Sequence, residues 1–171
     1  SKLTVQSDTS DADFATLAEE LGSAIKTDVS LIRKDTHAVL NIPSASVTAA
    51  RVALNDLRPG LRTMSSGETI EIYKEVGLPR HVASRFDIRK MSGSHGIGHT
   101  RMATESAVTT MGAHPFSTGS DQCLVHNGSL SNHNSLRRKL RREGIHIETE
   151  NDTEVGACLL YTSPSPRDQA K

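Results

Sequence analysis

Two kinds of hydrophobic periodicity alternate along this chain of 171 residues, and they restrict the fold that it can adopt. Lys2–Gln6 alternates apolar and polar residues with the two-residue period of a β-strand. Asp11–Lys26 instead places Phe14, Leu17 and Leu21 on one stripe, which is typical of an amphipathic helix. The N-terminal part of the chain is therefore predicted to form a strand followed by a helix.

Further predicted strands and helices follow in mixed order. The other strands are predicted at Val29–Arg33, Ala38–Ile42, Thr69–Lys74, Gly98–Ala103, Gln122–His126 and Ile145–Glu148. The other helices are predicted at Ser44–Leu57, His81–Phe86, Ser131–Glu143 and from Thr153 onward. Because the two types are intermixed along the chain, the pattern predicts an α/β or α+β fold.

The overall charge and the cysteine count exclude several classes of protein. Acidic and basic residues number 20 each, so no net charge favours a nucleic acid or an anionic membrane as partner. The basic residues of Arg137–Arg142 are interpreted as the solvated face of a helix. No apolar run approaches the roughly 20 residues that a membrane-spanning helix needs. Two cysteines make no disulfide framework, and we predict a reducing, cytoplasmic location.

The C-terminal residues 158–171 have an unusual sequence. The helix predicted from Thr153 runs into the Ser-Pro repeat at residues 163–166, which cannot continue a helix. The string from Cys158 to Asp168 resembles, codon by codon, the translation of a transposase adapter used in shotgun DNA sequencing. We therefore predict that the native sequence ends near Ala157 and that residues 158–171 are adapter read-through. A Pro-rich linker is the alternative interpretation.

Four polar clusters follow one another in the second half of the chain. They are Gly98–Arg101, Ala113–Phe116, Val125–Gly128 and Asn151–Glu154. In this order they supply a cation, an amide–glycine pair and an anion. Together such groups could hold an amino acid at both charged ends and stabilise an oxyanion at its side chain.

Each cluster also has an ordinary structural explanation. The Arg101 guanidinium fits a carboxylate in bidentate fashion, but it could equally form a structural ion pair. The Asn127 amide and the Gly128 N–H can converge on an oxyanion, although Asn-Gly is also a common turn. Asp152 could accept a substrate ammonium or act as a helix N-cap. Taken singly, each structural explanation is favoured.

A metal site and a cysteine nucleophile are weaker hypotheses. His95, His99, His114 and His126 are the obvious candidate ligands, but no HExxH or Cys–His spacing accompanies them. Cys123 lies in an apolar stretch without a cationic neighbour to lower its pKa, so we interpret it as a core thiol. We predict no metal and no other cofactor.

Read together, the clusters resemble class II glutamine amidotransferases, which are N-terminal-nucleophile hydrolases. The resemblance rests on His99–Thr110, Val125–His133 and Asn151–Glu154, and it is weaker over Ile70–Pro79. The subgroup most similar is the amidotransferase subunit of glutamate-synthase-like enzymes, with N-methylglutamate synthase among them. In sugar-amidating members, Trp and His usually stand where this chain has Met102 and Glu105.

The resemblance implies a role for each cluster. Arg101 would bind the α-carboxylate of glutamine, and Asp152 would bind its α-ammonium. The Asn127 side chain and the Gly128 N–H would form the oxyanion hole, while Thr104 and His114 would line the pocket. The implied fold is α+β, a four-layer αββα sandwich, incomplete here at both ends. The implied activity is glutamine hydrolysis, with the ammonia passed to a partner synthase subunit or domain.

The chain departs from this family at its beginning. The family nucleophile is an N-terminal Cys, and none is present near Ser1. We therefore predict that residues 1–157 are a partial type-2 amidotransferase domain and that this fragment is inactive. The alternatives are a non-catalytic glutamine-binding or regulatory module and a metal-dependent hydrolase.

Overall fold

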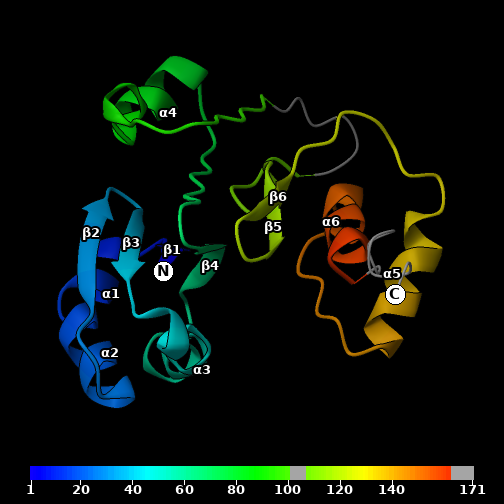
Figure 1. Ribbon diagram of the computed structural model, residues 1–171. Helices are drawn as coiled ribbons and strands as arrows, with labels where there is room; N and C mark the ends of the chain where they lie inside the picture. The colour runs from blue at the N-terminus through cyan, green and yellow to red at the C-terminus, as the bar shows by residue number, and fades with distance from the viewer. Residues whose placement is uncertain (101–106, 163–171) are drawn as a thin grey trace. The chain divides into compact units, whose positions relative to one another are not determined.

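The computed structural model describes residues 1–100 and 107–162, which form two compact units (Figure 1). Unit 1 comprises Ser1–Tyr73 and Gly77–Gly93, and unit 2 comprises Lys74–Val76 and Ser94–Lys171. Each unit contains a sheet and a hydrophobic cluster of its own.

Unit 1 is built on a four-stranded antiparallel sheet with the strand order β2-β3-β1-β4. The strands are β1 (Lys2–Gln6), β2 (Ser30–Lys34), β3 (His37–Asn41) and β4 (Arg62–Gly67). The pairing of β1 with β3 sets Leu3 opposite Leu40 and Val5 opposite Ala38. Because side chains alternate along a strand, these four residues share one face of the sheet.

This apolar face packs against three helices, α1 (Ser10–Phe14), α2 (Leu17–Ile25) and α3 (Val47–Leu57). A 3₁₀ turn at Ser44–Ser46 leads into α3. The buried cluster consists of Leu3, Val5, Phe14, Leu17, Leu21, Ala38, Leu40, Ile42, Ala50 and Leu54. Each large apolar side chain buried in this way contributes about 1.5–3 kcal/mol to folding. The cluster therefore fixes the strand register and the helix positions together.

The opposite face of the sheet is buried at the central strands β1 and β3, whereas Ile32 on the edge strand β2 is exposed. His37 follows the alternation of β3 onto this face, and its ring meets Phe86 edge-on with the ring centroids 4.9 Å apart. Tyr73 lies against the same two rings. The segment after β4, which includes α4 (Pro79–Arg85) and a 3₁₀ turn (Ile88–Lys90), therefore covers this face with aromatic side chains. Proline at the start of α4 suits a first helical position, where no N–H is needed.

Unit 2 joins a β-hairpin to two helices. The hairpin consists of β5 (Phe116–Gly119) and β6 (Gln122–Leu124), and the helices are α5 (His133–Arg142) and α6 (Asp152–Thr162). A small cluster of Leu140, Ile147, Val155 and Cys158, with Leu136 and Ile145 packed against it, holds α5 to α6. Leu136 and Leu140 therefore form the inward side of α5.

Two predicted strands are wrong. Neither Thr69–Lys74 nor Ile145–Glu148 joins a sheet, although Ile72 and Ile147 are both buried. Both segments bury alternate residues from an irregular backbone, which produces a strand-like pattern without a hydrogen-bonded ladder. The strand that pairs with β1 on the side away from β3 is β4, which lies earlier in the chain than Thr69–Lys74. For the strand predicted at Gly98–Ala103, residues 98–100 are irregular and residues 101–103 lie outside the described residues.

The helix predicted at Asp11–Lys26 is divided in two at Ala15 and Thr16. A tertiary contact lies at the division, where Arg58 Nε donates to the Asp13 carbonyl oxygen at 3.3 Å. In a continuous helix that carbonyl would accept a bond from within the helix. Phe14 and Leu17, on either side of the break, are both buried.

The fold is a mixture of helices and antiparallel sheets, so the α+β prediction is confirmed at that level. Across residues 1–100 and 107–162, no helix combines the length and the apolar character that crossing a bilayer requires. Helix α6 continues through residues 158–162, and Cys158 is buried in the unit 2 cluster. The predicted adapter origin of residues 158–171 stays a prediction, which sequencing the gene from genomic DNA would check.

Candidate functional site

Two of the predicted site residues, Asp152 and His114, lie at the N-terminus of α6. Asp152 is the first residue of this helix, and Asn151 precedes it. The side chain of Asn151 acts as the cap, because its Oδ1 accepts the Thr153 N–H at 2.9 Å. The capping role considered for Asp152 thus falls to its neighbour, and the Asp152 carboxylate is left for other contacts.

The Asp152 carboxylate connects α6 to the Asn127-Gly128 segment. Its Oδ2 accepts the backbone N–H of Leu130 at 2.7 Å, and Leu130 lies two residues beyond Gly128. The carboxylate is half-buried, and Thr153 Oγ1 lies 3.4 Å from its Oδ1. A carboxylate has about four lone-pair positions, so acceptor capacity remains for a ligand.

The space around Gly128 is limited by the His126 ring. A Cβ built at this position would lie 2.9 Å from His126 Nε2 and 3.2 Å from His126 Cε1, so a larger residue would require this ring to move. The backbone of Gly128 has no positive φ. Asn127 and Gly128 are both exposed, and the two donors predicted for an oxyanion are therefore accessible to a ligand.

His114 is buried beside the α6 N-terminus. Its Nε2 shares a hydrogen bond with Thr153 Oγ1 at 2.8 Å. The His99 ring lies against it with the centroids 4.3 Å apart, and the Phe116 ring meets it edge-on at 5.4 Å. His99 Nδ1 is buried without a hydrogen-bond partner among the described residues. His114 therefore contacts both His99 and Thr153.

Arg101 and Thr104 lie outside the described residues. Their predicted roles at the α-carboxylate and in the pocket wall stay predictions. His99, two positions before Arg101 in the sequence, is described, and its ring contacts His114.

Glu154 organises the loop that leads into α6, a role that sequence analysis did not assign. Its side chain is 8% exposed, and its carboxylate accepts the backbone N–H groups of Glu148 at 2.8 Å and Thr149 at 2.7 Å. The Thr149 hydroxyl donates to it as well, at 2.6 Å. Its position three residues after the capping Asn151 matches the spacing of a capping box. That spacing is the sequence signal that could have identified it.

Lys74 is a second residue that the sequence did not single out. It is 5% exposed, and its Nζ lies 4.2 Å from the centroid of the Phe116 ring. Burial lowers the Lys74 pKa to about 8, while the carboxylates of Glu154 and Glu148 act in the opposite direction. A cation on an aromatic face is stabilised by the ring quadrupole. Lys74 thus adds a buried, titratable amine next to the aromatic neighbour of His114.

Replacing Lys74 by Met should change how stability depends on pH. A folded-state pKa near 8, against an ordinary value of 10.5, means that the unfolded chain binds more protons between these two pH values. The contribution of Lys74 to the free energy of unfolding should therefore rise through this interval, by at most about 3 kcal/mol. Lys74→Met should lack this contribution, so the difference in the free energy of unfolding between the unmodified protein and the variant should grow with pH. Urea denaturation at a series of pH values measures both curves, and parallel curves would contradict the assignment.

The two cysteines are not poised for nucleophilic attack. Burial raises the pKa of the Cys123 thiol, and burial together with the Glu154 charge raises that of Cys158 to about 11. A nucleophilic thiol needs the opposite shift, because the thiolate is the reactive form. Cys123 is only half-buried on β6 and is not among the buried residues of the unit 2 cluster, so the interpretation as a core thiol is not confirmed.

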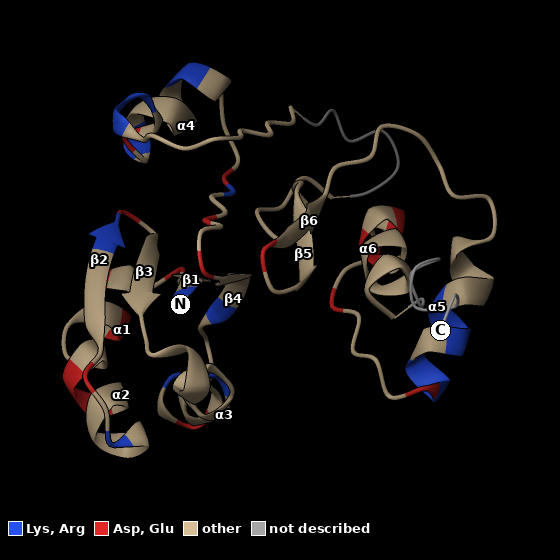
Figure 2. Ribbon diagram, in the orientation of Figure 1, with Lys and Arg blue, Asp and Glu red and all other residues tan. Residues whose placement is uncertain are grey.

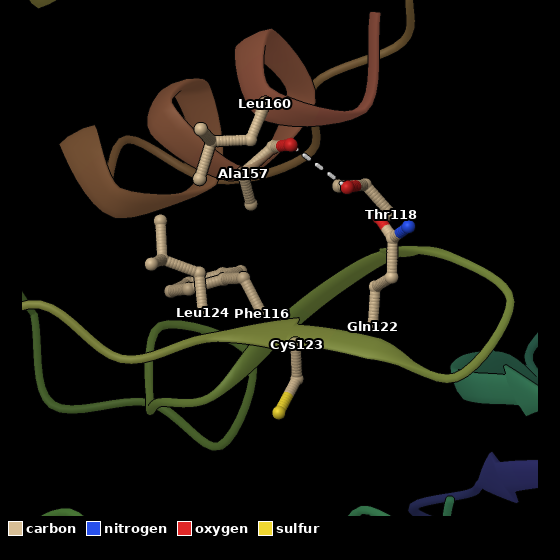
Figure 3. A pocket seen from close by; sticks show the side chains of 7 residues that line it. All are labelled: Phe116, Thr118, Gln122, Cys123, Leu124, Ala157 and Leu160. Carbon is tan, nitrogen blue, oxygen red and sulfur yellow. Dashed lines mark hydrogen bonds between the residues drawn. The ribbon is translucent and has the colours of Figure 1, made fainter. Parts of the chain in front are cut away.

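A small open pocket lies between the hairpin and α6 (Figure 3). Phe116, Leu124, Ala157 and Leu160 supply apolar walls, and Thr118 Oγ1 closes one side by donating to the Ala157 carbonyl oxygen at 2.9 Å. Cys123 points away from the other side chains (Figure 3). The lining contains none of the predicted site residues, so this pocket is not the candidate site. Among residues 1–100 and 107–162, no group of His, Cys, Asp and Glu side chains could hold a metal ion.

A comparison with protein families matches the part of the chain that contains α6. The family model described as "Glutamine amidotransferase domain" matches residues 87–162. This part of the chain is similar to that family. The matched amidotransferase segment contains every predicted site residue, from Arg101 to Asp152. The resemblance to glutamine amidotransferases is thereby confirmed, while the narrower likeness to glutamate-synthase-like subunits stays a prediction.

Curated relatives carry related names. The "Glutamine amidotransferase-like protein GlxB" of Rhizobium meliloti is 61% identical over 160 residues, which are 93% of this chain and 52% of that protein. A "Putative glutamine amidotransferase" of Methanothermobacter thermautotrophicus is 39% identical over 100 residues, or 57% of this chain and 32% of the relative.

A third relative is an aminotransferase. The "Glutamine--fructose-6-phosphate aminotransferase [isomerizing]" of Methanosarcina mazei is 39% identical over 105 residues, 60% of this chain and 16% of that enzyme. The chain thus spans about half the length of the Rhizobium relative and smaller shares of the other two. No solved structure matches.

Proposed function

We propose that the protein containing this chain hydrolyses the side-chain amide of glutamine and passes the ammonia to a synthase subunit or domain. The observation that carries the proposal is the Asp152–Leu130 hydrogen bond, which joins the start of α6 to the segment just after Asn127-Gly128. The name of the Methanosarcina relative, a glutamine-dependent aminotransferase, supports the same chemistry.

The candidate residues divide the recognition of glutamine among them. In this proposal Arg101 holds the α-carboxylate through its guanidinium fork, and Asp152 accepts the α-ammonium. Thr104 and His114 form the wall of the pocket. With both charged ends held, the side-chain amide is directed toward the Asn127 amide and the Gly128 N–H.

The reaction follows from this placement. A thiolate attacks the amide carbon, and the carbonyl oxygen becomes an oxyanion that Asn127 and Gly128 stabilise by hydrogen bonds. Collapse of this intermediate releases ammonia and leaves a thioester, which water hydrolyses to glutamate. Donors of this kind act on charge that develops only in the transition state, and each contributes about 3–4 kcal/mol.

The thiolate does not come from the two cysteines in the sequence, since both have raised pKa values. By resemblance it belongs to an N-terminal Cys whose own α-amino group serves as base. We therefore expect a polypeptide of this sequence to bind glutamine without hydrolysing it. Release of ammonia from glutamine by the purified polypeptide would contradict this.

A titration of the polypeptide with L-glutamine tests the binding site. Two-dimensional NMR of the backbone amides should show the largest shifts at Leu130 and Thr153, because both amides lie at Asp152. L-Glutamate has the same α-groups and no side-chain amide, and it should shift these amides too. Absence of any shift with glutamine would refute the proposal.

A non-catalytic glutamine-binding or regulatory module is the second candidate function. It shares the binding residues and differs in the nucleophile, so the N-terminus encoded by the complete gene discriminates between the two. An N-terminal Cys supports hydrolysis, and its absence favours the regulatory module. The cytoplasmic location and the domain limits 1–157 and 158–171 remain part of the proposal.

We also propose that the two units are parts of the four-layer αββα sandwich that the resemblance implies. The antiparallel sheet of unit 1, with α2 and α3 packed on its apolar face, supports one sheet and one helical layer. The β5–β6 hairpin and α6 of unit 2 support a second sheet and its helix. A crystal structure of the complete protein would test this arrangement.

A further inference from the structure

Arg137 differs from its basic neighbours on α5. Lys and Arg residues run along this helix (Figure 2), and Arg138, Lys139, Arg141 and Arg142 are exposed as a solvated face should be. Arg137 is only 5% exposed. Burying a guanidinium is costly unless its donors find acceptors, so its contacts indicate why it is buried. The interpretation of the whole basic run as a solvated face is wrong at this residue.

The Arg137 guanidinium contacts the two residues immediately before Asp152. Its Nη1 donates to Glu150 Oε2 at 2.6 Å, and its Nη2 donates to the Asn151 carbonyl oxygen at 3.3 Å. Glu150 is 85% exposed, so solvent screens that ion pair and it adds little to stability. The two bonds instead fix the position of the backbone. A planar guanidinium that reaches two acceptors restricts where the chain enters α6.

Two polar links join the residues 130–142 to the start of α6. One is the bond from the Leu130 N–H to Asp152, and the other is the pair of bonds from Arg137 to Glu150 and Asn151. Asn151 is held from another direction, because its Nδ2 donates to the Gly112 carbonyl oxygen at 3.0 Å. The position of Asp152 relative to Leu130 thus depends on the hydrogen bond from Arg137 to the Asn151 carbonyl oxygen.

We propose that Arg137 is a positioning residue that places the Asp152 carboxylate for recognition of the α-ammonium group of the substrate. This inference rests on the proposed function for the identity of the ligand. Arg137 touches neither the ligand nor the reacting atoms, and it acts by holding the backbone between Glu150 and Asp152.

Arg137→Lys tests the proposal with the charge retained. An ammonium is a compact charge that cannot reach two separate acceptors as the fork does. Affinity for L-glutamine should fall about tenfold, the equivalent of losing one well-placed hydrogen bond. Affinity for 4-carbamoylbutanoate, which is glutamine without its amino group, should stay within about twofold by the same reasoning. Arg138→Lys, the same change at an exposed position of α5, should alter neither.

The matched ligands separate positioning from a general loss of stability. A merely structural role for Arg137 would weaken both ligands equally, and that result would overturn the proposal. Glu150→Ala provides a second variant that should fold normally, because Glu150 is exposed. It removes one acceptor of Arg137 and should reduce the preference for glutamine in the same direction.

A second readout does not depend on any ligand. Hydrogen exchange of the Leu130 amide reports on its bond to Asp152, and exchange should be faster in Arg137→Lys than in Arg138→Lys. Unchanged exchange would overturn the proposal.

The variant Asp152→Asn distinguishes a failure of the Arg137 proposal from a failure of the proposed function. If this change leaves the preference for glutamine over 4-carbamoylbutanoate intact, the α-ammonium assignment fails, while Leu130 exchange still decides the role of Arg137.

Discussion

Replacing Asp152 by Asn is expected to weaken glutamine binding by about 10- to 100-fold, because one charge-assisted hydrogen bond is lost. The amide has nearly the shape of the carboxylate, and its oxygen can still accept the Leu130 N–H. It carries no charge to attract an ammonium group, however. Calorimetric titration with L-glutamine at neutral pH measures the effect.

The control for this prediction is a ligand that lacks the ammonium group. Binding of 4-carbamoylbutanoate to Asp152→Asn should match its binding to the unmodified chain. An equal loss with both ligands would mean that Asp152 only supports the fold. In that case its bond to Leu130 would be its whole contribution.

Replacing Glu154 by Gln is expected to lower the free energy of unfolding by about 2–4 kcal/mol. The buried carboxylate accepts two backbone N–H groups and one hydroxyl, from Glu148 and Thr149. A Gln side chain has one acceptor oxygen, and its NH₂ group would face a donor. Bonds to a charged acceptor contribute about 1.5–3 kcal/mol each, and a buried donor left unpaired adds its own cost.

Urea denaturation followed by circular dichroism measures this loss of stability. Glu143→Gln is a matched control, because Glu143 is exposed and ends α5. It should change the free energy of unfolding by less than about 0.5 kcal/mol. A similar small effect for Glu154→Gln would show that the loop before α6 does not depend on the carboxylate.

The match between sequence and structure was closest where burial and periodicity coincide. Lys2–Gln6 forms β1 over the predicted residues, because its alternating residues fill one face of a sheet. The same reasoning failed at Ile145–Glu148. There Ile145 and Ile147 belong to a loop and pack against the residues of α5 and α6. Their alternation reflects this packing and not a β-strand.

The candidate site divides in a similar way. The order of the polar clusters predicted an amino-acid site that includes Asn127, Gly128 and Asp152, and the roles of these residues stay predictions. The roles of Arg137 and Lys74 were not predictable, and the sequence signal for Glu154 was limited to its spacing from Asn151. Each depends on which backbone atoms or rings lie beside a buried charge.

By itself, the sequence determined the chemistry available to this protein, since a guanidinium, an amide and a carboxylate can recognise charged and polar groups wherever they are placed. Only the tertiary structure decided that Asn151 caps α6 and that the Asp152 carboxylate reaches Leu130. The physical reason is that hydrogen bonds require atoms about 3 Å apart. Residues 22 positions apart in the chain meet at that distance only after the loop and both helices have packed.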